Sequence, residues 1–129
     1  MKQLWFTTEE FKPLPAEEEK INPGRFGESL ATWVQTTLAD EGYTIEGNPT
    51  PEDWGWVVML QRKPFSLWVG CGNEDGSTTR WSLFVEAERG IFSRILSKAD
   101  PAPVVKAVEI KLEKLISEAG FKDVEWMQS

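Results

Sequence analysis

The chain has 129 residues, with 14 basic and 21 acidic side chains and a net charge of −7, and this length suits a single domain over residues 1–129. The acidic balance disfavours binding to a nucleic-acid backbone. The absence of histidine excludes Ser–His–Asp catalysis, Cys–His catalysis and His-ligated zinc.

The single cysteine, Cys71, excludes an internal disulfide and thiolate-rich metal clusters, so the sequence indicates no cofactor. The chain has no apolar run of the roughly 18 residues that a membrane-spanning helix needs. Its first residues, MKQLWFTTEEF, lack the apolar core of a signal peptide. We therefore expect a cytoplasmic protein that makes no membrane contact.

The N-terminal part predicts a strand, a loop and a helix. Leu4 to Thr8 has strand character, and the acidic run Glu17–Glu19 is typical of a solvated loop. Asn22 is a good N-cap and Pro23 a good first helical residue, so the helix is predicted to begin there and to end at Gly42. Its apolar stripe comprises Phe26, Leu30, Trp33, Val34 and Leu38.

The next segment is acidic. Tyr43 to Glu46 predicts a short strand or an extended link, and Gly47 to Pro51 predicts a turn-rich loop. Between Asp40 and Trp54 there are five acids and no base. This composition predicts a local negative patch made of Asp40, Glu41, Glu46, Glu52 and Asp53.

Three strands are predicted in the centre of the chain, at Trp54–Arg62, Phe65–Gly72 and Trp81–Ala87. Lys63-Pro64 indicates a tight hairpin and Asn73–Ser77 a looser turn, so the strands form an antiparallel meander. One face is fully apolar and needs a cover: Trp54, Trp56, Val58, Leu60, Phe65, Leu67, Val69, Cys71, Trp81, Leu83, Val85 and Ala87. The other face holds more apolar area than a solvent face usually shows, in Val57, Met59, Trp68 and Phe84.

The C-terminal part predicts a short helix at Arg89–Leu96, a long helix that starts at Asp100–Pro101 and ends at Gly120, and a last strand at Lys122–Trp126. The long helix has a buried stripe of Val104, Val108, Leu112, Leu115, Ile116 and Ala119. The fold class is therefore α+β, an antiparallel meander sheet of about five or six strands with two main helices packed on one face.

Three segments together resemble a pattern found in small uncharacterised bacterial proteins: PEDWGW at Pro51, QRKPF at Gln61 and LWVGCG at Leu67. The helix opening NPGRFG at Asn22 belongs to the same pattern, so the resemblance spans roughly Asn22 to Glu88. It implies no activity and carries no functional residues.

Two features could carry chemistry. Cys71 alternates in phase with apolar residues and has no histidine to activate it, so we interpret it as a buried small side chain. The acids Glu52 and Asp53 lie in one loop, and Glu74 and Asp75 lie in another. Either the two loops meet and hold a divalent cation or act in acid–base work, or they lie at opposite ends of the sheet as solvated acids, which is the commoner case.

The function that we expect is protein binding, as in an immunity protein or an adaptor, with a basic partner. The acidic residues Asp40, Glu41, Glu52 and Asp53 would meet this partner, and Trp68 is the expected aromatic contact. Two alternatives stay open. One is a small-ligand binder or carboxylate-based enzyme with a Trp-lined pocket, and the other is a homodimer.

Overall fold

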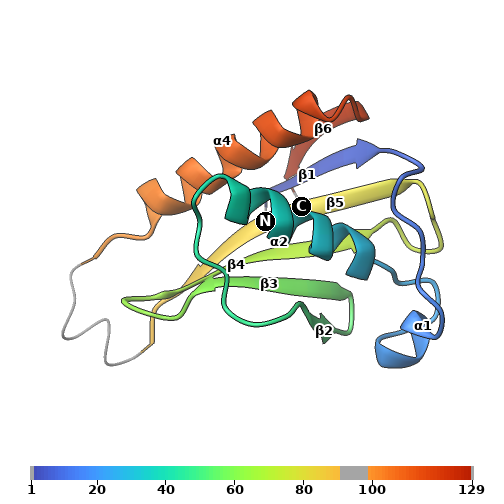
Figure 1. Cartoon of the computed structure of the whole chain (residues 1–129), viewed down its shortest axis with the longest axis horizontal. Helices are drawn as coiled ribbons and strands as arrows, with labels where there is room; N and C mark the ends of the chain where they lie inside the picture. Colours follow the sequence, from blue (N-terminus) through green and yellow to red (C-terminus); the bar gives the residue numbers. More distant parts are fainter. Residues whose placement is uncertain (1, 91–98, 129) are drawn as a thin grey trace.

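The computed structural model describes residues 2–90 and 99–128, and it confirms the α+β class (Figure 1). In these residues one antiparallel sheet has the strand order β2-β3-β4-β5-β1-β6. The helix predicted over residues 89–96 falls largely outside them. The strands are β1 (Lys2–Thr7), β2 (Thr50–Glu52), β3 (Gly55–Gln61), β4 (Ser66–Asn73), β5 (Arg80–Glu88) and β6 (Lys122–Gln128), and the helices are α1 (Glu17–Lys20), α2 (Glu28–Asp40) and α4 (Ala102–Glu118).

The predicted three-strand meander corresponds to β3, β4 and β5, and β2 adds a fourth strand at its edge, each antiparallel to the next. The first strand of the chain then lies on the far side of β5, where Leu4 is paired with Leu83. On the other edge of β1, Leu4 is paired with Trp126 of β6. The N-terminal strand therefore separates β5 from the C-terminal strand.

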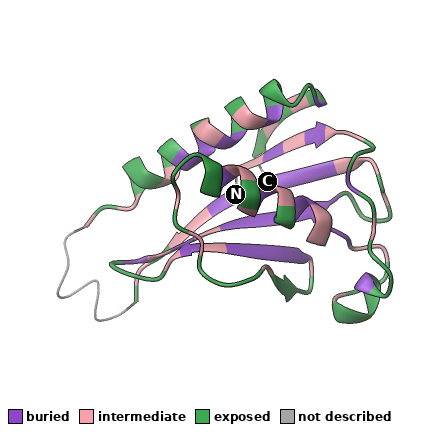
Figure 2. Cartoon of the chain, in the orientation of Figure 1, coloured by how far each residue is buried: buried purple, intermediate pink, exposed green. Residues whose placement is uncertain are grey.

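The core lies between one face of the sheet and the two long helices α2 and α4 (Figures 1 and 2). The alternating residues of the three central strands supply the sheet side of this core, as predicted, and Cys71 is fully buried among them. The helices contribute to the core Leu30, Ala31, Val34, Leu38, Val108, Leu112 and Ile116.

Within residues 2–90 and 99–128, none of the helices has the length and the apolar character that a membrane span requires.

The predicted start of the first long helix was wrong. Helix α2 begins at Glu28 rather than at Pro23, because the residues before it form a turn that is hydrogen-bonded to Asp53 and Asn73. The side-chain amide of Asn22 donates a hydrogen bond to the carbonyl of Asp53 instead of capping a helix (2.9 Å). The backbone N–H of Phe26 donates a hydrogen bond to the side-chain oxygen of Asn73 in β4 (3.1 Å), which is a partner outside the helix.

The prediction that the acidic run is solvated was wrong for its first residue, Glu17, which is 1% exposed. One carboxylate oxygen accepts the N–H of Leu14 (3.0 Å). The other accepts the N–H groups of Gly27 and Glu28 and the indole N–H of Trp56, each at 2.8 Å. The carboxylate thus satisfies free donors of the first turn of α2, where negative charge is favourable.

Three residues were also assigned to the wrong face. Trp54 precedes β3, so the strand alternation does not apply to it, and its ring stacks with Trp68 on the sheet face away from the helices. Val104 is 38% exposed, and Val105 packs against the core in its place. Ala119, predicted to be buried, is exposed. Part of the predicted loop before Trp54 is the edge strand β2, which pairs with β3.

Candidate functional site

The sheet face away from α2 and α4, which we call the open face, holds apolar side chains at its centre. Directly paired residues on neighbouring strands share a face, so the register places Met59, Trp68 and Glu86 side by side across β3, β4 and β5. Val57 and Phe84 belong to the same face, and both are less than a tenth exposed. The predicted semi-apolar second face is confirmed.

Three rings form an aromatic cluster on this face: Trp54, Trp68 and Phe84. The ring of Trp54 lies 5.0 Å from that of Phe84 and 6.3 Å from that of Trp68, centroid to centroid, and Trp68 lies 5.6 Å from Phe84. Phe84 lies directly over Gly70, because a Cβ at Gly70 would overlap its ring. The glycine therefore allows the phenyl ring to lie close to the backbone of β4.

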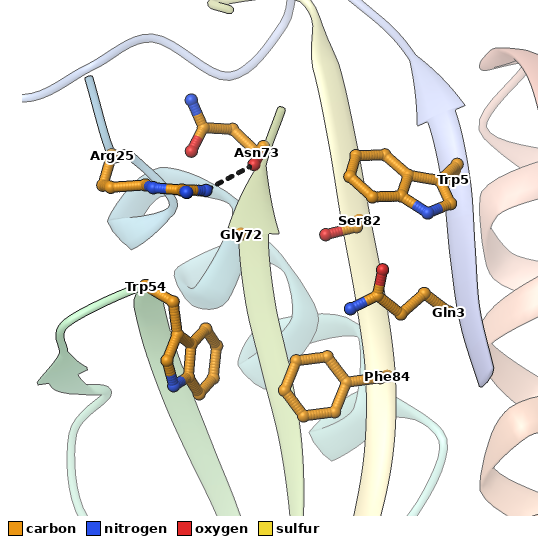
Figure 3. Close-up of a pocket in the computed structure, with 8 residues that line it drawn as sticks. All are labelled: Gln3, Trp5, Arg25, Trp54, Gly72, Asn73, Ser82 and Phe84. Atoms are coloured by element: carbon orange, nitrogen blue, oxygen red, sulfur yellow. Dashed lines mark hydrogen bonds between the residues drawn. The ribbon is translucent and has the colours of Figure 1, made fainter. Parts of the chain in front are cut away.

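A pocket of about 380 Å³ lies on one side of this cluster, and we call it the Arg25 pocket. Figure 3 shows Arg25 at one end and Phe84 at the other, with Trp54 on one side and Trp5 and Gln3 facing it. The complete lining is Gln3, Trp5, Arg25, Trp54, Gly72, Asn73, Ser82 and Phe84. The pocket thus has aromatic walls, one cation and several neutral polar groups.

The backbone around Arg25 is held by Asn73, the last residue of β4, which is 3% exposed. Its amide oxygen accepts the N–H of Phe26 (3.1 Å). Its amide nitrogen donates to the carbonyls of Gly24 (3.0 Å) and Ser77 (2.8 Å). Asn73 therefore fixes the residues on both sides of Arg25 to the β4–β5 turn, so the position of the arginine is set before any ligand binds.

The guanidinium of Arg25 makes only long contacts within the described part of the chain. One nitrogen lies 3.5 Å from the carbonyl of Asn73, and another lies 3.8 Å from the carboxylate of Asp75. The Arg25 side chain is 34% exposed, and that of Asp75 is 69% exposed. Because a guanidinium has five N–H groups, donors of Arg25 remain available to a bound molecule.

Ser82 places a hydroxyl in the pocket although the residue is only 5% exposed (Figure 3). Among the described residues the buried side-chain atom without a hydrogen-bond partner is Glu28 Oε1, so the Ser82 hydroxyl is not a buried unpaired group. Beneath it, Gly72 keeps the floor open, since a Cβ there would lie 3.6 Å from the Ser82 oxygen and 4.0 Å from the Trp54 ring. The hydroxyl belongs to the pocket lining, where it can donate a hydrogen bond to a ligand or to solvent.

A second depression of about 460 Å³ lies on the other side of the aromatic cluster, and we call it the Glu52 hollow. Trp54 and Trp68 line it together with two carboxylates, Glu52 and Glu88. Arg62 also reaches it and is paired with Glu46 (3.4 Å). The remaining lining residues are Thr50, Val57 and Met59.

The residues predicted to bind a partner fall into two groups. Glu52 and Trp68 line the same hollow on the open face, and Asp53 follows Glu52 in the turn into β3. Asp40 and Glu41 lie at the C-terminal end of α2, in the helix layer, where Glu41 is 3.6 Å from Lys111 of α4. The acidic segment is therefore continuous in sequence but divided in space.

The two acidic loops lie at the same end of the sheet, because Gly55 and Gly72, the residues next to them, are paired. The turn with Asn22 and Arg25 lies between them and contacts Asp53 and Asp75. Among the described residues no group of three or more possible ligands is placed to hold a metal ion. For Cys71, burial raises the pKa far above its ordinary value, so the thiol stays protonated and inert.

Sequence reasoning did not single out Arg25, Ser82 or Gln3. A signal was present for Ser82, because a serine between Trp81 and Leu83 in a strand must face away from the core. Arg25 gives no such signal, since its position depends on hydrogen bonds to Asn73, 48 residues away.

Comparison of the chain with protein-family models, with curated proteins and with solved structures finds no match.

Proposed function

We propose that this protein is a protein-binding module that docks a basic segment of a partner protein on the open face, in an immunity-like or adaptor-like role. The observation that carries the proposal is the Glu52 hollow, where the rings of Trp54 and Trp68 lie beside the carboxylates of Glu52 and Glu88. A lysine or arginine side chain gains from both groups, because it stacks on an indole face and pairs with a carboxylate.

Two further features support a basic partner. Tryptophan is enriched among the residues that dominate binding energy at interfaces, and Trp68 is a central residue of the open face. The net charge of −7 would accelerate the approach of a positively charged protein. The proposal includes a cytoplasmic location, which is supported by the single free cysteine.

The test is affinity capture from the native lysate with the wild-type protein, two variants of equal charge and Trp68→Ala. Glu52→Gln with Glu88→Gln removes the carboxylates of the hollow, and Asp40→Asn with Glu41→Gln removes two from the helix layer. Both variants raise the net charge of −7 by two units, so a difference between them reports position rather than charge.

We expect the wild type and the Asp40–Glu41 variant to capture one basic protein. The Glu52–Glu88 variant and Trp68→Ala should not capture it. The complex should weaken at high salt, because exposed charge pairs are screened. Binding is then measured with the purified partner. An empty capture, or equal capture by all four proteins, would contradict the proposal. So would a dimer in light scattering that Trp68→Ala converts to a monomer, because a second copy of the chain would then cover the open face.

A further inference from the structure

The Arg25 pocket has three features that the docking of a basic partner does not explain. It holds a cation, Arg25, whose backbone is fixed from both sides by Asn73. Its lining includes Ser82, whose hydroxyl adds a hydrogen-bond donor although the residue is only 5% exposed. Its floor is Gly72, whose missing side chain leaves the space between Ser82 and the ring of Trp54 unfilled. A basic group would be repelled here by the guanidinium.

We propose that the Arg25 pocket is a binding site for a small aromatic carboxylate, a flat ring that carries one carboxyl group. The carboxylate lies against Arg25 and the Ser82 hydroxyl, and the ring lies over Gly72 against Trp54 and Phe84 (Figure 3). This inference does not rest on the proposed function, since the two ligands occupy different sides of the aromatic cluster.

The anionic group is assigned from the guanidinium. The planar fork of an arginine matches the two oxygens of a carboxylate, and such charged hydrogen bonds are about twice as strong as neutral ones. A phosphate dianion is disfavoured, because Arg25 is the only cationic side chain among the lining residues and Asp75 lies 3.8 Å from it. Arg25 can therefore neutralise one negative charge in this pocket.

The ring is assigned from the walls. Trp54, Phe84 and Trp5 present aromatic surface, and offset or edge-to-face contacts between rings favour a flat aromatic guest. The glycine floor lets such a ring approach the backbone of β4 closely. The volume of about 380 Å³ lies within the range of pockets that hold small organic molecules.

The probes are benzoate, phenylacetate and indole-3-acetate, each compared with its neutral amide and with inorganic phosphate. Binding is measured by titration calorimetry, and the site is located from the indole N–H signals in NMR spectra. We expect at least one carboxylate to bind with a Kd below about 1 mM and its amide to bind at least about tenfold more weakly. The signals of Trp54 and Trp5 should shift.

Two variants test the residues, each with a matched control. Arg25→Gln should weaken binding about tenfold or more, whereas Arg62→Gln, which changes the exposed arginine of the Glu52 hollow, should leave it unchanged. Ser82→Ala should weaken binding severalfold, and Ser66→Ala, on the same sheet face but outside the pocket, should not.

Gly72→Ala gives an independent check that does not disturb the Arg25 turn. Its Cβ would fill the floor between Ser82 and Trp54, and its nearest neighbour would be the Trp54 carbonyl at 3.3 Å, so the fold needs only a small adjustment. We expect this variant to melt near the wild-type temperature and to lose the carboxylate. The inference is overturned if no aromatic carboxylate binds at about 10 mM, if the amides bind equally well, or if Gly72→Ala and Arg25→Gln both bind as the wild type does.

Discussion

The ring of Phe84 lies directly over Gly70 of the neighbouring strand, in the space that any side chain at Gly70 would occupy. The aromatic cluster therefore depends on the absence of a side chain in β4. Trp54, tilted, and Trp68, edge-on, then pack against a phenylalanine whose position is set by the backbone beneath it.

Gly70→Ala should destabilise the protein by about 1–3 kcal/mol, because the new methyl group overlaps the Phe84 ring in a packed region. The double variant Gly70→Ala with Phe84→Ala should cost less than the sum of the two single changes. Urea unfolding followed by tryptophan fluorescence measures all three. Gly90→Ala is the control, since apart from its chain neighbours no atom of the described residues lies within 4 Å of its Cβ position, and it should stay within about 0.5 kcal/mol.

Glu17→Ala should lower the free energy of unfolding by about 3 kcal/mol or more, because it leaves the N–H groups of Gly27 and Glu28 and the indole N–H of Trp56 buried and unpaired. Glu17→Gln, which keeps one acceptor oxygen, should fall between this variant and the wild type. Denaturant melts give the values. Glu19→Ala, two residues away and exposed, should change little, and equal losses at both positions would contradict the assigned role.

Cys71 should make stability fall at alkaline pH. Burial raises the pKa of its thiol well above the ordinary value of 9.0, so above about pH 9 the unfolded chain loses this proton and the folded chain retains it. The free energy of unfolding then decreases by about 1.4 kcal/mol per pH unit from this group, and it is unaffected below that pH.

Cys71→Ala should remove this slope relative to the wild type, since all other alkaline titrations are shared by the two proteins. Chemical denaturation at several pH values between about 8 and 11 measures it. A thiol reagent added to the folded wild type should react only at the rate of unfolding, because the sulfur is fully buried. Fast labelling under native conditions would contradict the burial.

Arg80 should hold the edge strand β6 in place. Its guanidinium donates hydrogen bonds to the Thr7 hydroxyl, to the carbonyl of Asp123 and to the carboxylate of Glu125, and the Arg80 side chain is only 20% exposed. Arg80→Ala should cost about 1–2 kcal/mol. Hydrogen exchange should accelerate in β6 more than in β3 and β4.

Lys114→Ala is the control for Arg80, because Lys114 belongs to an exposed ion pair with Glu118 on α4. Its effect should stay below about 0.5 kcal/mol. Uniformly faster exchange in the Arg80 variant would show that the arginine supports the whole sheet rather than its edge.

The fold class was predictable because it follows from local patterns. The alternation in β3, β4 and β5 and the helical stripe at Val108, Leu112 and Ile116 depend only on which residues face the core. The face of Trp54 was predicted wrongly because Trp54 lies in a turn just before β3, where successive side chains no longer point to alternate faces. Val104 failed because a helical stripe shifts when its neighbour Val105 packs equally well.

The site was less predictable, because long-range hydrogen bonds build it. Nothing near Glu17 indicates burial, since its partners at Gly27 and Trp56 lie 10 and 39 residues away. In the sequence, Asp40 and Glu52 belong to one acidic segment. In the structure, Asp40 lies at the end of α2 in the helix layer, and Glu52 lies in β2 beside the open face. Trp68 could be assigned correctly because its face follows from its phase within a regular strand.

The strand order has a consequence for how the chain assembles during synthesis. The ribosome makes β1 well before its two partners, because the strands on both of its edges begin at Arg80 or later. Leu4 and Phe6 are both fully buried in the folded sheet, so they lack strand partners until the residues from Arg80 onward are made. Pairings that distant slow folding and leave an apolar segment exposed to aggregation. A chaperone that binds β1 during synthesis would protect this apolar segment until β5 and β6 are made.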